Sequence, residues 1–190
     1  MYNKILEYWF NGSYKNNLKR WFMEGYKYDK EIKKIFYNIL KNYKKYKNWH
    51  LNKDSYLAYI ILLDQFSRQI YRNNSKAFKY DKIILRFMKK YLSKYIESFN
   101  AIEKMFVLMP LQHSPNIKDQ KKGLKLLKHL ISKEQNSKEK KILQLAYKHQ
   151  YGHYKIIKKF NRFPKRNKAL NRKSTNEENI YLQINNKLSY

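Results

Sequence analysis

Apolar residues recur at intervals of three and four positions along most of the chain, which is the spacing of amphipathic helices. Short polar segments separate these runs, so we expect an all-α fold of about eight helices in antiparallel pairs. Trp21 and Phe22 read as an anchored loop, and Ser174 with Glu177 forms a capping box for a short last helix. The longer predicted helices span residues 2–10, 28–46, 78–96, 101–111, 116–133 and 138–160.

Residues 101–111 are almost continuously apolar but too few to cross a bilayer, so we expect a central buried helix that Pro110 closes. A second buried helix is predicted around residues 62–72, LLDQFSRQIYR. One side of it is apolar, whereas Asp64, Gln65, Arg68 and Arg72 converge on the other side. The i,i+4 steps from Asp64 to Arg68 and on to Arg72 stack one carboxylate and two guanidiniums along a ridge, which is either a site or an exposed ion-pair ladder.

The composition fits one helical domain, residues 1–184, followed by a frayed tail at 185–190. Only 4 Gly and 3 Pro are present among 190 residues, so turn signals are few. No Cys occurs, and no signal peptide or membrane-spanning run is visible. These features suit an intracellular, cytoplasmic protein, although an organelle would satisfy them equally.

The formal net charge of +29 favours a polyanionic partner such as RNA, or an anionic membrane surface. The excess is nearly all Lys and accompanies abundant Asn, Tyr and Ile, so compositional drift towards A and T in the coding sequence explains it as well. Seven of the 43 basic residues are Arg, and five of these lie in two short stretches. Because a guanidinium grips carboxylate or phosphate with a fork that Lys lacks, this clustering points to geometry that matters.

The stretch KNYKKYKNWH at 41–50 mixes basic and aromatic residues, which is typical of single-strand binding as well as of a solvated helix end. In the first interpretation, bases stack on aromatic rings while Lys side chains contact phosphates. The candidate nucleic-acid surface consists of Lys41, Tyr43, Lys44, Lys45, Tyr46, Lys47 and Trp49.

Three histidines are candidates for metal ligands or for a catalytic base. His149 and His153 share one helix face and His113 could join them, but no HExxH motif is present. We therefore expect core histidines bonded to backbone carbonyls, with no metal and no cofactor. Ser114 beside His113 is explained better by helix capping than by nucleophilic catalysis.

Three blocks, LDQFSRQIYR at 63–72, LMPLQHS at 108–114 and HYKIIKKFNRFPKRNKALNRKSTNEE at 153–178, resemble the bacterial family catalogued as domain of unknown function 924. That family's pattern runs approximately LDQFPRNIYR, LPLEHSED, HRDIIxRFGRFPHRN and LGRxSTxEE. The resemblance implies a tetratricopeptide-like helical fold and no established activity. Two chemical groups differ, since Gln112 replaces a Glu and Lys165 replaces a His.

The matched positions are rich in groups that hold anions, and we expect them to form a buried Arg and His cluster. The protein is then a helical binding or scaffold protein, non-enzymatic, whose ligand is a small anion or a peptide. An RNA-binding or ribonucleoprotein subunit is the second hypothesis, and an enzyme acting on a phosphorylated or carboxylate substrate is the third. The predicted pocket comprises Asp64, Gln65, Arg68, Arg72, His113, His153, Arg162, Arg166 and Asn167.

Overall fold

The computed structural model describes residues 1–185, which form ten α-helices linked by short 3₁₀- and π-helical segments. The predicted all-α class is confirmed, with ten helices in place of about eight. The chain divides into two compact units: a terminal unit, residues 1–80 with the chain from Pro164, and an inserted unit, residues 81–163. The predicted tail at 185–190 lies outside the described residues, apart from Asn185, where α10 ends.

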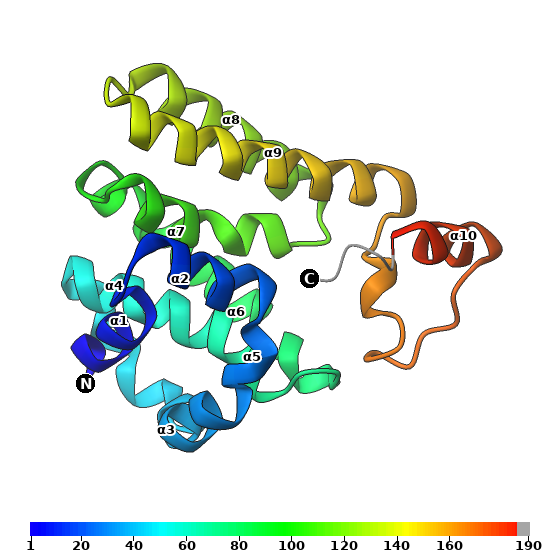
Figure 1. Cartoon of the computed structure of the whole chain (residues 1–190), viewed down its shortest axis with the longest axis horizontal. Coiled ribbons are helices and arrows are strands. Elements are labelled where there is room, and N and C mark those ends of the chain that lie inside the picture. Colours follow the sequence, from blue (N-terminus) through cyan, green and yellow to red (C-terminus); the bar gives the residue numbers. More distant parts are fainter. Residues whose placement is uncertain (186–190) are drawn as a thin grey trace. The chain divides into compact units, whose positions relative to one another are not determined.

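The terminal unit is organised around a largely buried segment, α4 and the π-helical segment Ile61–Phe66 after it, against which α1 and α3 pack (Figure 1). Every residue from Ser55 to Asp64 is buried, and helical structure with mostly buried residues continues to Ile70, so the buried helix predicted around residues 62–72 is confirmed up to Ile70. The helices of this unit are α1 Tyr2–Phe10, α2 Tyr14–Leu18, α3 Asp29–Lys41, α4 Lys53–Ile60, α5 Ser67–Ile70 and α10 Asn176–Asn185.

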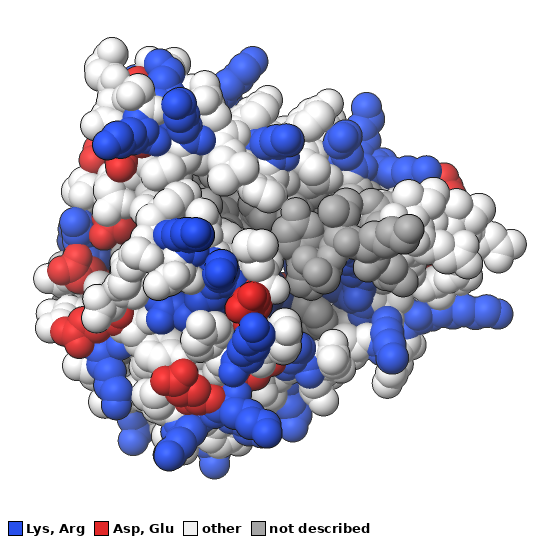
Figure 2. All heavy atoms as spheres, in the orientation of Figure 1, with Lys and Arg blue, Asp and Glu red and all other residues white. Residues whose placement is uncertain are grey.

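The inserted unit is built on α7, which contacts α6, α8 and α9 and buries its residues from Met105 to Leu111. This confirms the predicted central helix. The last two helices of this unit, α8 and α9, form an antiparallel pair (Figure 1), and their exposed side chains are rich in Lys (Figure 2). The helices of this unit are α6 Asp81–Tyr95, α7 Ala101–His113, α8 Ile117–Lys133 and α9 Ser137–Phe160.

Pro110 does not close α7, contrary to expectation, because the helix continues to His113. The carbonyls that the last turn leaves without a helical donor are bonded from α8. Gln120 Nε2 donates to the carbonyl oxygens of Leu111 at 3.2 Å and Gln112 at 2.7 Å. A donor from α8 therefore satisfies carbonyls of the turn that follows Pro110.

Two further local predictions were wrong. Residues 19–23, which include Trp21 and Phe22, form a π-helix rather than a loop. The helix predicted to reach Tyr46 ends at Lys41, because Asn42 leaves the helical conformation and its side chain donates to the carbonyl of Asn38 at 2.8 Å.

The capping box of the last helix lies one residue later than predicted, at Thr175 and Glu178. The Thr175 N–H donates to Glu178 Oε2 at 2.9 Å, and the Glu178 N–H donates to Thr175 Oγ1 at 3.2 Å. Ser174 is instead engaged by Asn167, which donates to its hydroxyl oxygen. The register therefore follows from a tertiary contact rather than from the motif alone.

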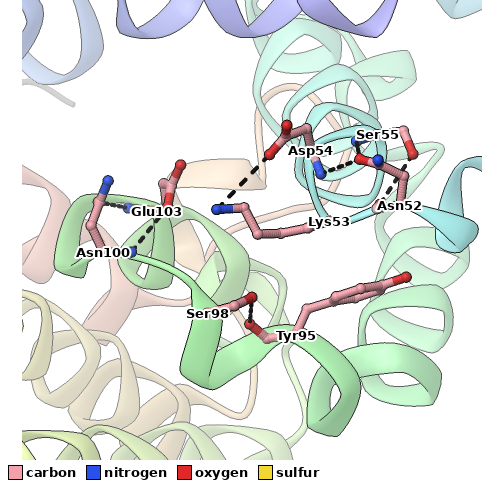
Figure 3. Close-up of polar contacts among 8 residues, drawn as sticks. All are labelled: Asn52, Lys53, Asp54, Ser55, Tyr95, Ser98, Asn100 and Glu103. Carbon is pink, nitrogen blue, oxygen red and sulfur yellow. Dashed lines mark hydrogen bonds and ion pairs between the residues drawn. The ribbon is translucent and has the colours of Figure 1, made fainter.

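Two helices begin at Asn caps that are drawn in Figure 3. Asn52 Oδ1 accepts from the N–H of Asp54 and Ser55 at the start of α4. At the start of α7, Asn100 and Glu103 form a reciprocal capping box. These caps set where the two buried helices of the fold begin.

Candidate functional site

Two guanidiniums from distant parts of the chain lie against one aromatic ring in the terminal unit. The guanidinium carbon of Arg68 is 5.1 Å from the centre of the Phe78 ring, and that of Arg166 is 4.7 Å from it. Asp64, which is 1 % exposed, lies 3.7 Å from Arg68 and accepts a 2.6 Å hydrogen bond from Gln65. We call Arg68, Arg166 and Phe78 the arginine pair and its ring.

The ring is positioned by the backbone of the 3₁₀-helical turn Ser75–Phe78. Ser67 donates from its hydroxyl to the carbonyl of Leu63 at 2.7 Å and lies 3.3 Å from that of Ala77. Arg68 also reaches the Ala77 carbonyl, at 3.5 Å. The turn that carries Phe78 is thus attached to the same α5 turn that carries Arg68.

Arg72 lies outside this arrangement. Its guanidinium forms two hydrogen bonds with Asp29, at 2.5 and 2.8 Å, in a forked pairing that is partly exposed. The predicted ridge is interrupted because α5 ends at Ile70, and Tyr71 takes φ −117° and ψ 32°. The direction of the side chain at Arg72 is therefore not that of a continuing helix.

Asn167 is 2 % exposed and belongs to the turn before α10. Its Nδ2 donates to Ser174 Oγ at 3.0 Å and to Glu178 Oε2 at 3.2 Å. These bonds hold the capping box of α10 in place. In this arrangement Asn167 stabilises the segment that carries Arg166.

The two histidines of the predicted pocket meet in the inserted unit. The rings of His113 and His153 lie edge to face with centroids 6.3 Å apart, and Phe163 lies 5.5 Å from His153. His153 Nδ1 is 3.0 Å from the carbonyl oxygen of His149, so this nitrogen carries the proton and donates. The expected bond from a core histidine to a backbone carbonyl is present for His153.

Arg162 follows directly after α9, also in the inserted unit. The residue before it, Asn161, takes a left-handed conformation with φ 53° and caps the helix. Glycine is usual at such a position, and Asn is the substitute that best tolerates it. The structure thus divides the predicted pocket residues between the two units and joins Arg68 to Arg166 within one of them.

Ser114 has a structural task. Its hydroxyl donates to Asp119 Oδ2 at 2.6 Å and accepts from the N–H of Asn116 at 3.2 Å. Asp119 in turn pairs with Lys89. The N-cap of α8 is Asn116, so the expectation that Ser114 caps this helix is wrong. The serine instead holds Asp119 and the turn before the helix. Within the described part of the chain, no three His, Cys, Asp or Glu side chains gather as a metal site.

The predicted nucleic-acid surface at residues 41–49 has exposed lysines, but its rings are half-buried and pack on other aromatic residues. Trp49 lies 4.6 Å from Tyr46, 6.0 Å from Tyr2 and 6.2 Å from Tyr59, measured between ring centroids. Tyr43 contacts Tyr80 in the same way, at 5.2 Å. Nucleic-acid binding by this surface stays a prediction.

Sequence reasoning missed the ring that joins the arginine pair and the carboxylate that engages Arg72. Phe78 was assigned to the start of a helix, and nothing in its neighbourhood signals two distant cations. Asp29 lies 43 residues before Arg72, too far along the chain for helical spacing to connect the two.

Comparisons with known proteins place the chain in a family. The chain is similar to a solved protein of unknown function from Agrobacterium tumefaciens, with 24 % identity, a TM-score of 0.81, and coverage of 96 % of this chain and 97 % of that one. No curated protein matches. No helix among residues 1–185 combines the length and apolar character needed to cross a membrane. The model of the family described as bacterial protein of unknown function (DUF924) matches residues 5–186, and the chain therefore belongs to that family.

Proposed function

We propose that this protein binds a small anionic ligand, bearing phosphate or carboxylate, at the arginine pair. The observation that carries the proposal is that Arg68 and Arg166, nearly a hundred positions apart, lie against the same ring of Phe78. Their guanidinium carbons are therefore no more than about 10 Å apart, which is close to the screening length of about 8 Å at physiological salt. Both arginines are half-buried, and partly buried charges are screened less than exposed ones, so the two cations still repel in part.

An anion between the two guanidiniums would offset this repulsion. Asp64 lies 3.7 Å from Arg68 and places a negative charge beside the pair. Arg is scarce in this chain, so a forked donor at both positions favours bidentate recognition of a carboxylate or phosphate. The side chain of Arg68 is 21 % exposed, so a ligand can reach it from solvent.

The competing interpretation is a network that only locks the fold. In that case Asp64 neutralises Arg68, and the Phe78 ring holds both guanidiniums by cation–π contact. The two interpretations differ in what a ligand does, because a molecule that binds the folded state alone raises the unfolding temperature.

The test is thermal unfolding with increasing inorganic phosphate or pyrophosphate, at ionic strength held constant with chloride. We expect the midpoint to rise with ligand concentration in the wild type and in Arg86→Lys, a control at an exposed Arg outside the pair. Arg68→Lys and Arg166→Lys should each remove most of that rise, since Lys cannot form the fork. No rise in the wild type, or an equal rise in all four proteins, would overturn the proposal.

We also propose that the protein is intracellular and cytoplasmic, a location that the lack of cysteine fits. We assign no reaction to the pair, because two guanidiniums and a phenyl ring supply no group that accepts a proton.

A further inference from the structure

Three tyrosines form a stripe along α9, on a face that the predicted sites do not use. Tyr147, Tyr151 and Tyr154 are spaced i, i+4 and i+7, so they share one side of the helix. The Tyr147 and Tyr151 rings are nearly parallel, at 4° with centroids 6.5 Å apart, and Tyr151 and Tyr154 lie at 26° and 6.0 Å. We call these residues the tyrosine stripe.

The ring faces of the stripe are only partly covered by one another. Ring centroids 6.0 and 6.5 Å apart are too distant for two rings to cover each other's faces completely. Tyr151 is 45 % exposed, and Tyr147 and Tyr154 are half-buried. Aromatic surface on this face is therefore open to a planar partner.

The charge around the stripe has one sign. Lys155 lies over the Tyr151 ring at 5.3 Å, and Lys148 and Lys158 are exposed on neighbouring turns. Figure 2 shows Lys spheres along the region where α8 and α9 lie in Figure 1. From residue 115 to 160 no Asp or Glu is exposed, and the exposed charged residues are Lys118, Lys121, Lys122, Lys125, Lys128, Lys133, Lys138, Lys141, Lys148, Lys155, Lys158 and Lys159.

The carboxylates of this helix pair are directed to structural partners. Glu139 accepts from the N–H of Ala101 at 2.5 Å, Glu134 accepts from the N–H of Asn136 at 2.8 Å, and Asp119 is paired with Lys89. The acidic groups of α8 and α9 therefore stabilise the fold, while the surface they leave is basic.

We propose that the tyrosine stripe and its lysines bind single-stranded nucleic acid, with bases stacked on the rings and phosphates contacted by Lys148, Lys155 and Lys158. Stacking on aromatic rings within a basic groove or face is how proteins hold single strands without reading sequence. An anionic membrane is the weaker match, because interfacial helices insert large apolar side chains. Apart from Tyr151 of the stripe, Leu145, 39 % exposed, is the one exposed large hydrophobic residue on the described α8–α9 pair.

This inference is independent of the arginine pair, because the stripe lies in the inserted unit and the pair in the terminal unit. It also concerns residues other than the basic and aromatic stretch at 41–49. The rings there pack on Tyr2, Tyr59 and Tyr80, whereas the rings of the stripe are arranged along one helix.

The test is fluorescence anisotropy with a labelled single-stranded uridine oligomer of about 15 nucleotides, a length that covers the usual site sizes. Loss of one stacking ring should weaken binding by about fivefold to a hundredfold, so we expect this for Tyr151→Ala, whereas Tyr151→Phe keeps the ring and should stay within about twofold of wild type. Tyr14→Ala is the matched control, since Tyr14 is 43 % exposed and Tyr151 is 45 % exposed. Far-UV circular dichroism checks that each variant is folded.

A second comparison separates the stripe from general charge. The triple variant Lys148→Glu, Lys155→Glu and Lys158→Glu should bind more than about tenfold more weakly and show a shallower dependence on salt. The charge-matched triple Lys30→Glu, Lys33→Glu and Lys34→Glu, at exposed positions of α3 outside the candidate nucleic-acid surface, should bind nearly as the wild type does. Equal losses in the two triples, or wild-type binding by Tyr151→Ala, would overturn the proposal.

Three further probes identify the partner. A single-stranded thymidine oligomer should bind similarly if stacking and phosphate contact suffice, and preference for RNA would add a contact to the ribose hydroxyl. Duplex RNA of the same length should bind more weakly, because its bases are already stacked. Tighter binding to the duplex, or binding to vesicles of anionic lipid that depends on Tyr151 while RNA binding does not, would contradict the assignment.

Discussion

The side-chain amide of Gln150 on α9 donates to that of Gln120 on α8 at 2.6 Å, and both residues are almost completely buried. Gln120 Nε2 then donates to the carbonyls of Leu111, Gln112 and Ser114 at the end of α7. One pair of neutral amides thus connects three helices of the inserted unit. Buried polar groups connected in this way stabilise a fold only when each has its partner.

Gln120→Leu should therefore destabilise the protein strongly. Leu fills a similar volume but leaves the α7 carbonyls and the Gln150 amide without their donor and acceptor, so we expect a loss of about 2–4 kcal/mol in the free energy of unfolding. Urea unfolding measures it. The control is Gln144→Leu, at an exposed position of α9, which should change stability by less than about 0.5 kcal/mol. Similar losses in both variants would refute the role of the amide pair.

Two glycines inside helices should respond in opposite directions to alanine. A Cβ at Gly123 would lie 2.8 Å from the side chain of Gln150, which the amide pair holds in place, whereas a Cβ at Gly152 meets nothing within 4 Å. We expect Gly152→Ala to stabilise by about 0.5–1 kcal/mol through helix propensity. Gly123→Ala should lose about 1–2 kcal/mol despite that gain, because the core is overpacked. Thermal or urea unfolding measures both changes in stability. Stabilisation by both substitutions would show that the Gln150 side chain moves aside freely.

Stability should fall as the pH falls through the range in which His149 titrates. Burial, and then the charge of Lys148, lower the pKa of His149 below its ordinary value of 6.5. The unfolded chain therefore takes up the proton first, so the stabilising contribution is complete above pH 6.5 and is lost as the pH falls below it.

The measurement is the unfolding midpoint between about pH 7.5 and pH 5.5, a window above the titration of most carboxylates. His149→Gln should show a shallower decline than the wild type. His129→Gln, at an exposed position of α8, should keep the wild-type slope. Identical slopes in all three proteins would mean that His149 does not couple to folding.

Exchanging the amide of Asn167 and the carboxylate of Glu178 in a double variant should destabilise the protein less than replacing the amide of Asn167 alone. In Asn167→Asp, a carboxylate oxygen replaces the donor that lies 3.2 Å from Glu178 Oε2, so two buried like charges face each other and stability falls by about 3 kcal/mol or more. Adding Glu178→Gln restores a donor and an acceptor and should recover at least about half of the loss. No recovery in the double variant would show that the two residues are not coupled.

Helix periodicity predicted most of the fold because it is a local property. The boundaries of the long helices α7, α8 and α9 were predicted within a few residues, since their apolar faces repeat over several turns. The errors lie where one contact outweighs the local pattern. Examples are α7, which Gln120 extends past Pro110, and the last capping box, which Asn167 holds at Thr175 and Glu178.

The candidate site was predictable in its residue types but not in its grouping. Scarce Arg residues in a Lys-rich chain indicated Arg68 and Arg166, but their meeting at Phe78 depends on a turn that joins α5 to a distant segment. Arg72 was grouped with them on helical spacing, and the end of α5 at Ile70 removed the basis for that grouping.

The sequence by itself determined the all-α class, the buried segment around Leu62, the central helix and the family, because these depend on residue order and on the spacing of apolar positions. The tertiary structure decided which polar groups share one place: Arg68 with Arg166, Arg72 with Asp29, and Gln120 with Gln150. Such pairs join residues far apart in the chain. No local pattern encodes them, because the packing of the helices brings their side chains within hydrogen-bonding and ring-contact distance.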